Sequence, residues 1–277
     1  MSNYCFSCAV IFVVFIAIVR AVSIIPQVEV NPWVQRSHVR FVDHDPATNN
    51  FLFRTGTPSD LFSAIDMPGL KRDFGEEAKK AGLKLPDDFY LIDLCLWTSE
   101  YEDIAKEAKW FSDHKDRGEF HWWPMWGVSQ EYVDAGCKLN NITHCATNMQ
   151  PGTMSPEDEK VMALSYPQWA NDTADQIGSR MAMVNAWLHT PADKPRVIFG
   201  HCTCGCDRTG EFFAAYMLQY QNKSFVEAMT IDESVPKRHI GYSHQVAAQW
   251  YCNYLRLNGN ITTDDCDKCE PFRCSDS

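Results

Sequence analysis

The segment from His201 to Gly210 reads His-Cys-Thr-Cys-Gly-Cys-Asp-Arg-Thr-Gly and separates two regular patterns. The run before it, 196–200, is short, apolar and partly β-branched, which predicts a buried strand. The run after it, 211–220, predicts a helix. A loop at a helix start presents unpaired N–H groups and the positive end of the helix dipole. The segment is therefore suited to bind an anion.

Within this segment a cysteine and an arginine are separated by five residues. A loop of this length can converge its N–H groups on one tetrahedral oxyanion, and Gly205 permits the unusual backbone dihedrals that this needs. Arg208 can hold two phosphate oxygens at once. The same N–H groups favour the thiolate form of Cys202, and a thiolate that faces a bound phosphorus is a nucleophile. Thr209 can donate its hydroxyl to that sulfur.

These residues resemble the signature of the cysteine-dependent protein tyrosine phosphatase superfamily: His-Cys, five residues, Arg, Ser or Thr, and Gly. Rhodanese-like domains also place a cysteine on such a turn but lack both ends of the signature. The resemblance implies an α/β domain with a central mixed, mainly parallel sheet flanked by helices. It also implies phosphomonoester hydrolysis through a phosphocysteine intermediate, without cofactor or metal. The catalytic residues would include Cys202, Arg208 and Thr209, and the substrate-binding loop would be Thr203, Cys204, Gly205, Cys206, Asp207 and Arg208.

The sequence allows three interpretations of the function. A phosphorylated protein is favoured, as for a tyrosine or dual-specificity phosphatase, and a small phosphomonoester is compatible. The Asp-Arg-Thr-Gly ending is similar to branches that accept phosphoinositides, so hydrolysis of a phosphoinositide or an inositol phosphate is the second, although Cys206 stands where those branches often have lysine. A silent phosphate-binding module is the third, since no Trp-Pro-Asp sequence is present.

Weaker resemblance extends from about residue 50 to residue 257. Residues 50–59 are similar to the opening strand of a subset of the superfamily, and we expect a helix to start near Ser59 and Asp60. Residues 89–94 are similar to the Ile-Asp-Leu-Arg strand of the superfamily, and Cys95 stands where arginine is frequent in that strand. The further elements that we expect are a strand at 120–125 and helices at 100–114, 173–188, 224–231 and 243–257.

The general acid should lie about 30 residues before the nucleophile in this superfamily. Asp172 lies 30 residues before Cys202 and is our candidate, although it could equally cap the helix predicted from Thr173. It directly follows Asn171, which heads a glycosylation sequon. The other acids considered are Asp158, Asp175 within the first helical turn, and Asp207.

Several residues have a structural and a functional interpretation. His201 should hold the loop through hydrogen bonds. Trp122, Trp123 and Trp126 could form a substrate rim, but packing is favoured. The basic turn 237–239 could attract an anion, but a solvated turn is favoured. Gln245 or Gln249 could position the attacking water.

The 277 residues, of which 45% are hydrophobic, suffice for one sizeable α/β domain. The net charge of −11 argues against nucleic acid and strongly anionic membranes as main partners. The organisation that we expect is a signal peptide at 1–23, an N-terminal extension at 24–48, the phosphatase-like domain at 49–258 and a cysteine-rich tail at 259–277.

The amino terminus predicts entry into the secretory pathway. An unbroken apolar run of 12 residues, 8–19, precedes Arg20 and the small residues Ala21 and Ser23. An uncleaved membrane anchor at about 4–25 is the alternative, which the short run and Arg20 disfavour. Four glycosylation sequons and 12 cysteines also favour a secreted or lumenal glycoprotein. The sequons begin at Asn141, Asn171, Asn222 and Asn260.

The cysteines predict disulfides, with a pairing that the sequence leaves open. Cys204 and Cys206 could trap Cys202, could regulate it reversibly, or could be packing residues. Zinc binding by Cys266 and Cys269 is the weaker alternative, because no second close pair accompanies them. The expected disulfide partners are Cys137, Cys145, Cys252, Cys266, Cys269 and Cys274.

Overall fold

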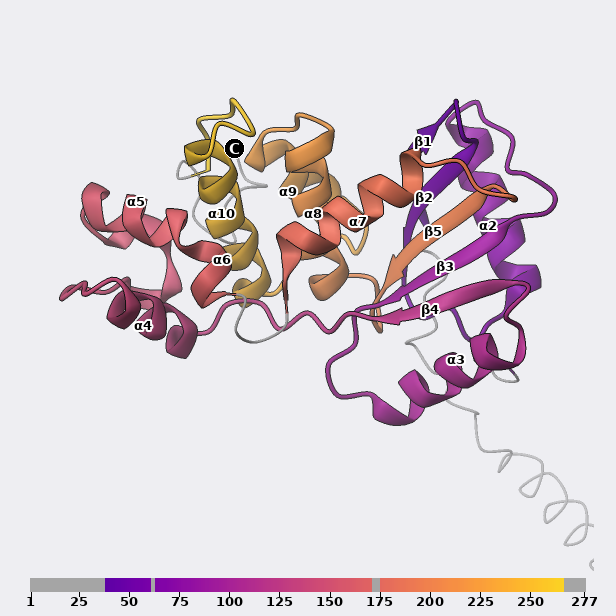
Figure 1. The fold of residues 1–277 in the computed structure, drawn as a ribbon, viewed down its shortest axis with the longest axis horizontal. Coiled ribbons are helices and arrows are strands. Elements are labelled where there is room, and N and C mark those ends of the chain that lie inside the picture. Colours follow the sequence, from indigo (N-terminus) through magenta and orange to yellow (C-terminus); the bar gives the residue numbers. More distant parts are fainter. Residues whose placement is uncertain (1–37, 61–62, 171–174, 267–277) are drawn as a thin grey trace, which may run out of the picture. The chain divides into compact units, whose positions relative to one another are not determined.

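A five-stranded sheet forms the centre of the domain, in the order β1-β2-β5-β3-β4 (Figure 1). The computed structural model describes residues 38–60, 63–170 and 175–266. The chain divides into the units 1–33 and 34–277, and every described residue belongs to the second. β1 runs antiparallel to β2, and the other neighbouring pairs are parallel, so the predicted mixed, mainly parallel sheet is confirmed. The strands are β1 Arg40–Asp45, β2 Asn50–Thr55, β3 Tyr90–Cys95, β4 Gly118–Trp122 and β5 Arg196–His201.

The inner strands are buried on both faces, as their apolar runs require. Every residue of β2 is buried, and β3 and β5 are buried apart from their first residues. Alternate side chains enter two separate cores. Phe53, Leu91 and Phe199 belong to one core, and Leu52, Ile92 and Ile198 to the other.

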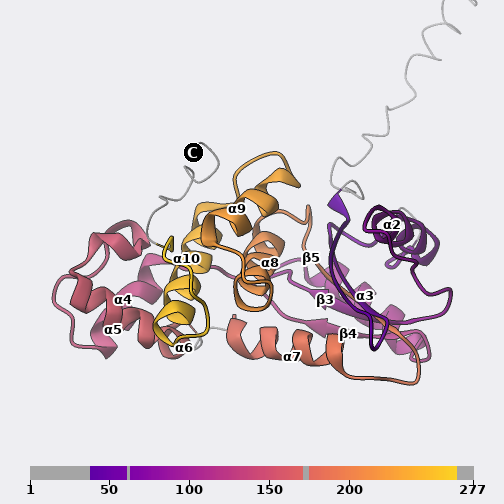
Figure 2. The ribbon, with the colours of Figure 1, turned by 90° about the horizontal axis from the view of Figure 1, so that it is seen from above.

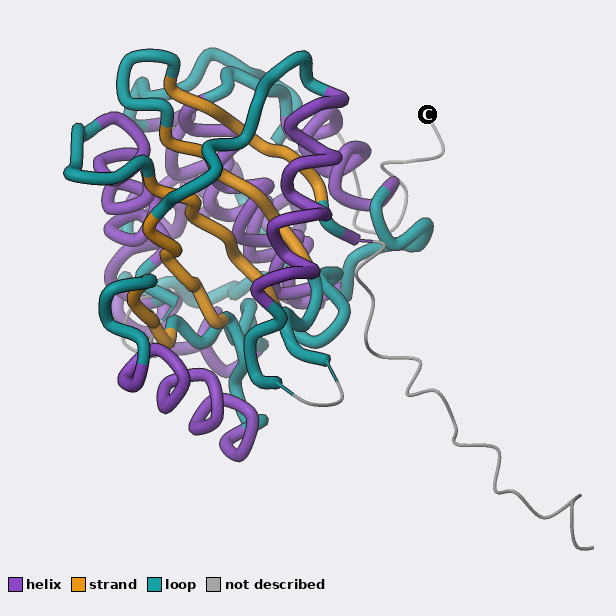
Figure 3. The backbone as a smooth tube through the Cα atoms, turned by 90° about the vertical axis from the view of Figure 1, so that its right-hand side faces the viewer, coloured by secondary structure: helices purple, strands orange, loops and turns teal. Residues whose placement is uncertain are grey.

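Helices cover both faces of this sheet (Figures 2 and 3). α2 and α3 contribute Phe74 and Phe111 to the core of the first face. α7 and α8 lie against the second face, and α9 and α10 pack on α8. The helices are α2 Met67–Lys80, α3 Tyr101–Asp113, α4 Gln130–Leu139, α5 Pro156–Leu164, α6 Tyr166–Trp169, α7 Ile177–His189, α8 Asp207–Tyr220, α9 Phe225–Ser234 and α10 Tyr242–Leu257, with 3₁₀ turns at Thr147–Met149 and Pro151–Thr153.

Two predicted helix starts and one strand end are wrong. Asp60 accepts a hydrogen bond from the Ser63 amide and forms a turn, whereas α2 starts at Met67 behind the capping residue Asp66. α7 starts at Ile177, so Asp175 precedes this helix and does not lie in its first turn. β4 ends before Pro124, which has no N–H to donate to a neighbouring strand.

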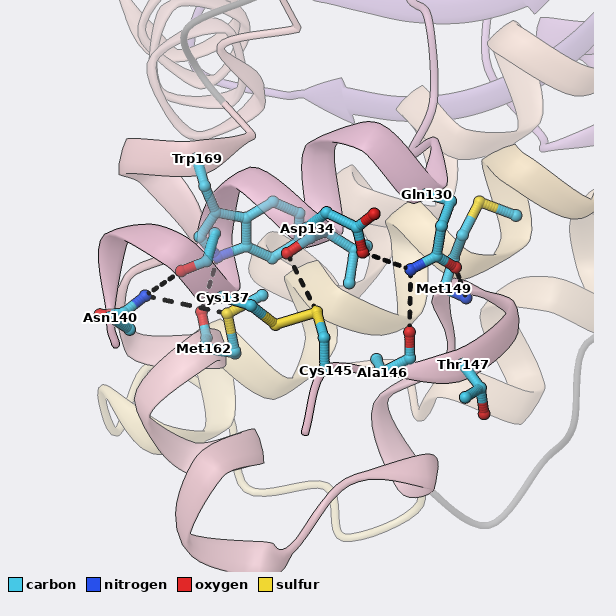
Figure 4. Close-up of a disulfide and its surroundings, with 12 residues drawn as sticks. Gln130, Asp134, Cys137, Asn140, Cys145, Ala146, Thr147, Met149, Met162 and Trp169 are labelled. Carbon is cyan, nitrogen blue, oxygen red and sulfur yellow. Dashed lines mark hydrogen bonds between the residues drawn. A yellow bond between two sulfur atoms is a disulfide. The ribbon is translucent and has the colours of Figure 1, made fainter. Parts of the chain in front are cut away.

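Disulfides fasten the helical part of the domain. Cys137 at the end of α4 bonds Cys145 in the following loop, as Figure 4 shows. Cys252 in α10 bonds Cys266. Disulfide bonding is thus confirmed for these four residues, while Cys269 and Cys274 lie outside the described residues. The bond to Cys252 occupies the Cys266 sulfur, so the zinc alternative for that residue is wrong.

Candidate active site

The loops after β2, β3, β4 and β5 emerge at one edge of the sheet. Because these strands are parallel and in register, their last residues are aligned: Thr55 pairs with His201, His201 with Cys95, and Cys95 with Trp122. Ligands of parallel α/β sheets commonly bind at this carboxyl edge. The predicted phosphate loop, residues 202–206, joins β5 to α8 there.

The path of the phosphate loop is held by contacts from β2 and the residues after it. The amide and hydroxyl of Thr57 both donate to the carbonyl of Thr203, at 3.1 and 2.8 Å. Arg54 donates to the carbonyl of Gly205 at 2.9 Å. Gly205 has φ +70°, and a Cβ there would lie 2.5 Å from the carbonyl oxygen of Thr55. Only glycine therefore fits at this position without displacing the backbone.

Cys202 is a free thiol at the start of the loop, and only 2% of its surface is exposed. Three arginines interact electrostatically with it: Arg54, Arg208 and Arg238. Arg54 is itself buried, forms an ion pair with Asp232, and has its pKa lowered to about 9 by burial. The Cys202 sulfur therefore lies in a region of positive potential.

The two other loop cysteines bond to each other, Cys204 with Cys206. Cys202 is therefore not captured by either of them in this structure, which the sequence left open. His38 holds the outside of the loop, with Nδ1 placed 2.5 Å from the carbonyl oxygen of Cys204 and 3.9 Å from the Cys206 sulfur. Regulation through these cysteines stays a prediction.

Arg208 lies in the first turn of α8 and is oriented by Glu100, the residue before α3. Its two terminal nitrogens donate to the two Glu100 oxygens at 3.1 and 2.9 Å. Burial on its own would raise the pKa of Glu100, but the hydrogen bonds from Arg208 and the Ser99 amide lower it to about 2. The sequence indicated Glu100 only as the start of a helix. No local pattern around Glu100 connects it with Arg208, which lies 108 positions away in the chain.

Asp207 and Thr209 flank Arg208 and differ in their surroundings. Both Asp207 oxygens accept hydrogen bonds from Arg238 at 2.8 Å, and Oδ1 also accepts the Gly241 amide. Burial would raise the pKa of Asp207, but these contacts lower it, which disfavours the role of proton donor. The Thr209 hydroxyl is buried and has no hydrogen-bond partner among the described residues.

The candidate acid Asp172 lies outside the described residues, whereas Asp175 occupies an unexpected position. Its carboxylate accepts the amides of Trp126 and Gly127 at 2.8 and 3.0 Å, in the segment that follows β4. Burial and the nearby Glu211 raise the pKa of Asp175 to about 7. Asp158 is in the first turn of α5, where its amide donates to the capping hydroxyl of Ser155.

The remaining candidates include both exposed and buried side chains. Trp122 and Trp126 are exposed, whereas Trp123 stacks on Trp187. Gln245 and Gln249 are buried and donate to Glu233 and to the Cys266 carbonyl, respectively. Arg238 of the basic turn is paired with Asp207, as described above.

Comparisons with known proteins add little. No family model and no curated protein matches the chain. One matching solved structure is a Leishmania major chain provisionally assigned as a protein tyrosine phosphatase. The identity is 15%, the match covers 78% of this chain and 98% of that chain, and the TM-score is 0.31. Among the described helices, none has the length and apolar character needed to cross a membrane.

Proposed function

We propose that the protein hydrolyses phosphomonoesters through a phosphocysteine intermediate on Cys202. The observation that carries the proposal is the free, buried thiol between β5 and α8, surrounded by the charges of Arg54, Arg208 and Arg238. Two further observations support the proposal: Cys202 lies at the carboxyl edge of the parallel strands, and five residues separate it from Arg208.

In the first step the Cys202 thiolate attacks phosphorus, so that an S–P bond forms and the ester P–O bond breaks. The loop amides and Arg208 stabilise the equatorial oxygens, and Glu100 keeps the guanidinium oriented. The leaving oxygen takes a proton from a general acid, for which we retain Asp172.

In the second step water attacks the phosphocysteine, the S–P bond breaks, and inorganic phosphate leaves. The Thr209 hydroxyl, which has no hydrogen-bond partner among the described residues, can donate to the departing sulfur. The deprotonated acid takes a proton from the attacking water.

The charges around the loop favour esters with a single phosphate, such as phosphotyrosine or phosphoserine in a protein. Arg238, whose Nη2 lies 3.8 Å from the Cys204 sulfur of the loop, is neutralised by both oxygens of Asp207. Multiply phosphorylated inositol rings need additional unpaired cations. We therefore keep the phosphoinositide class as the second candidate.

We also propose a secreted or lumenal location. The three disulfides are compatible with an oxidising compartment. Asn141, Asn222 and Asn260 of the sequons are exposed and accessible for glycosylation. A mobility shift that a glycosidase abolishes would support this location, and an unmodified chain from a secretory host would contradict it.

The test is turnover of an aryl phosphate in the absence of divalent metal, with and without thiol reductant. Cys202→Ser should abolish turnover, and Arg208→Lys, which keeps the charge but loses the fork, should lower kcat/KM about 100-fold or more. The exposed Arg117→Lys is the matched control and should leave turnover unchanged. No turnover in either redox state, with vanadate still bound, would make the chain a phosphate-binding module instead.

A further inference from the structure

Four ionisable side chains are buried together behind the phosphate loop. Asp93 and Cys95 alternate along β3, and His201 is the register partner of Cys95 on β5, so all three side chains lie on the same face of the sheet. Glu107 reaches them from α3, which covers that face (Figure 1). Their exposed fractions are 0, 0, 0 and 1%.

These side chains are close enough to form ion pairs. Nε2 of His201 lies 3.0 Å from Asp93 Oδ1 and 3.3 Å from Glu107 Oε2. Apart from these ion-pair contacts, both imidazole nitrogens and all four carboxylate oxygens have no well-formed hydrogen bond to another described residue. Buried polar atoms of this kind are costly and need an explanation.

A single cation would satisfy several of these atoms at once. One donor atom each from Cys95, Glu107 and His201 lies within 4.8 Å of the other two. Ligands of a tetrahedral zinc ion, at about 2.0–2.3 Å from the metal, lie about 3.3–3.8 Å from one another. The side chains therefore need only a small inward movement to coordinate zinc.

The types of donor atom in this group favour zinc over other divalent metals. A thiolate and an imidazole are poor ligands for magnesium and calcium, which prefer oxygen, whereas sulfur, nitrogen and carboxylate oxygen together suit zinc. Zinc binding would displace the protons of the Cys95 thiol and of the imidazole nitrogen that coordinates it, and the divalent charge would then offset the negative charge of the thiolate and carboxylates.

We propose that Cys95, Glu107 and His201 bind a structural zinc ion next to Asp93, whose Oδ1 lies 3.0 Å from Nε2 of His201. The ion ties α3 to the ends of β3 and β5, one residue before Cys202. It takes no part in phosphoryl transfer. An open cavity of about 270 Å³ is lined by Glu107 together with Asp60, Asp103 and Lys106.

The test measures the metal content of the full chain, purified from a secretory host, after loading with zinc chloride and dialysis against metal-free buffer. We expect about one zinc per chain. Replacement by cobalt(II) should give the visible absorption of tetrahedral cobalt with a thiolate charge-transfer band. Neither readout needs turnover, so the site can fail or succeed independently of the phosphatase proposal.

Single substitutions test which residues bind the zinc ion. Cys95→Ser and Glu107→Gln should lose the zinc, whereas Cys202→Ser, which removes the other free thiol of the described chain, should retain it together with the charge-transfer band. Glu102→Gln, on the exposed face of α3, is the control and should also retain zinc.

Three results would overturn the proposal: wild type without bound zinc, stoichiometric zinc in folded Cys95→Ser and Glu107→Gln, or loss of zinc in Cys202→Ser. If a ligand variant fails to fold, the cobalt spectra of wild type and Cys202→Ser decide the matter. A charge-transfer band in both supports Cys95 as the thiolate ligand, and its absence from either excludes the site.

Discussion

The replacement Glu100→Gln tests whether the orientation of Arg208 matters for the proposed reaction. The bidentate contact with Arg208 accompanies a pKa of Glu100 that falls from 4.5 to about 2. At about 1.4 kcal/mol per unit this corresponds to about 3 kcal/mol. The Glu100 side chain is 28% exposed, so solvent screening reduces the value to about 1–2 kcal/mol. We expect kcat/KM for an aryl phosphate to fall about 5- to 30-fold.

The stability of the same variant should depend on pH in a defined direction. Because the folded-state pKa of Glu100 is depressed, its contribution is complete above the unfolded value and is lost as pH falls towards about 2. The difference in unfolding free energy between wild type and variant should thus shrink between about pH 5 and pH 2. Urea titrations at several pH values measure it.

The matched control is Glu102→Gln, an exposed carboxylate in the first turn of α3. It should change neither kcat/KM nor the pH dependence of stability. Equal effects of the two substitutions would refute the reasoning. A higher kcat/KM in Glu100→Gln would also refute it, because it would show that Glu100 competes with substrate for Arg208.

The remaining predictions concern Gly205 of the loop and the two candidate acids, Asp172 and Asp175. Gly205→Ala should lower kcat/KM about 100-fold by displacing the loop, while Gly152→Ala, with nothing within 4 Å of the added carbon, should have no effect on turnover of an aryl phosphate. Asp172→Asn should lower kcat on an alkyl phosphate about 10²- to 10⁴-fold and remove the basic limb of its pH profile. Asp175→Asn should keep the basic limb of the kcat pH profile. If Asp175→Asn loses this limb, Asp175 is the general acid. Because the pKa of Asp175 is raised to about 7, wild-type stability should fall as pH rises from about 4 to 7, and Asp175→Asn should lack this dependence in urea titrations.

The local pattern of the chain determined most of the fold. The apolar run 196–200 became β5, and the predicted helices at 100–114, 224–231 and 243–257 appear with ends shifted by a few residues. α3 and α10 have clear hydrophobic periodicity, and α9 begins with a capping box formed by Ser224 and Glu227. Both signals depend only on neighbouring residues. Errors occurred where local signals competed. Asp60 has a side chain suited to cap a helix, but it forms a turn instead, and the residue that caps α2 is Asp66, six positions later.

The sequence by itself also determined which loop carries the candidate chemistry, because the cysteine, glycine and arginine of the phosphate loop lie within one short segment. Only the tertiary structure decided what surrounds them. Glu100, Arg54 and His38 come from segments more than 100 residues away in the chain, and the buried group behind the loop is assembled from β3, α3 and β5. The physical reason is that parallel strands align their carboxyl ends, so distant loops share one edge, and side chains two residues apart share one face. No local pattern encodes that convergence.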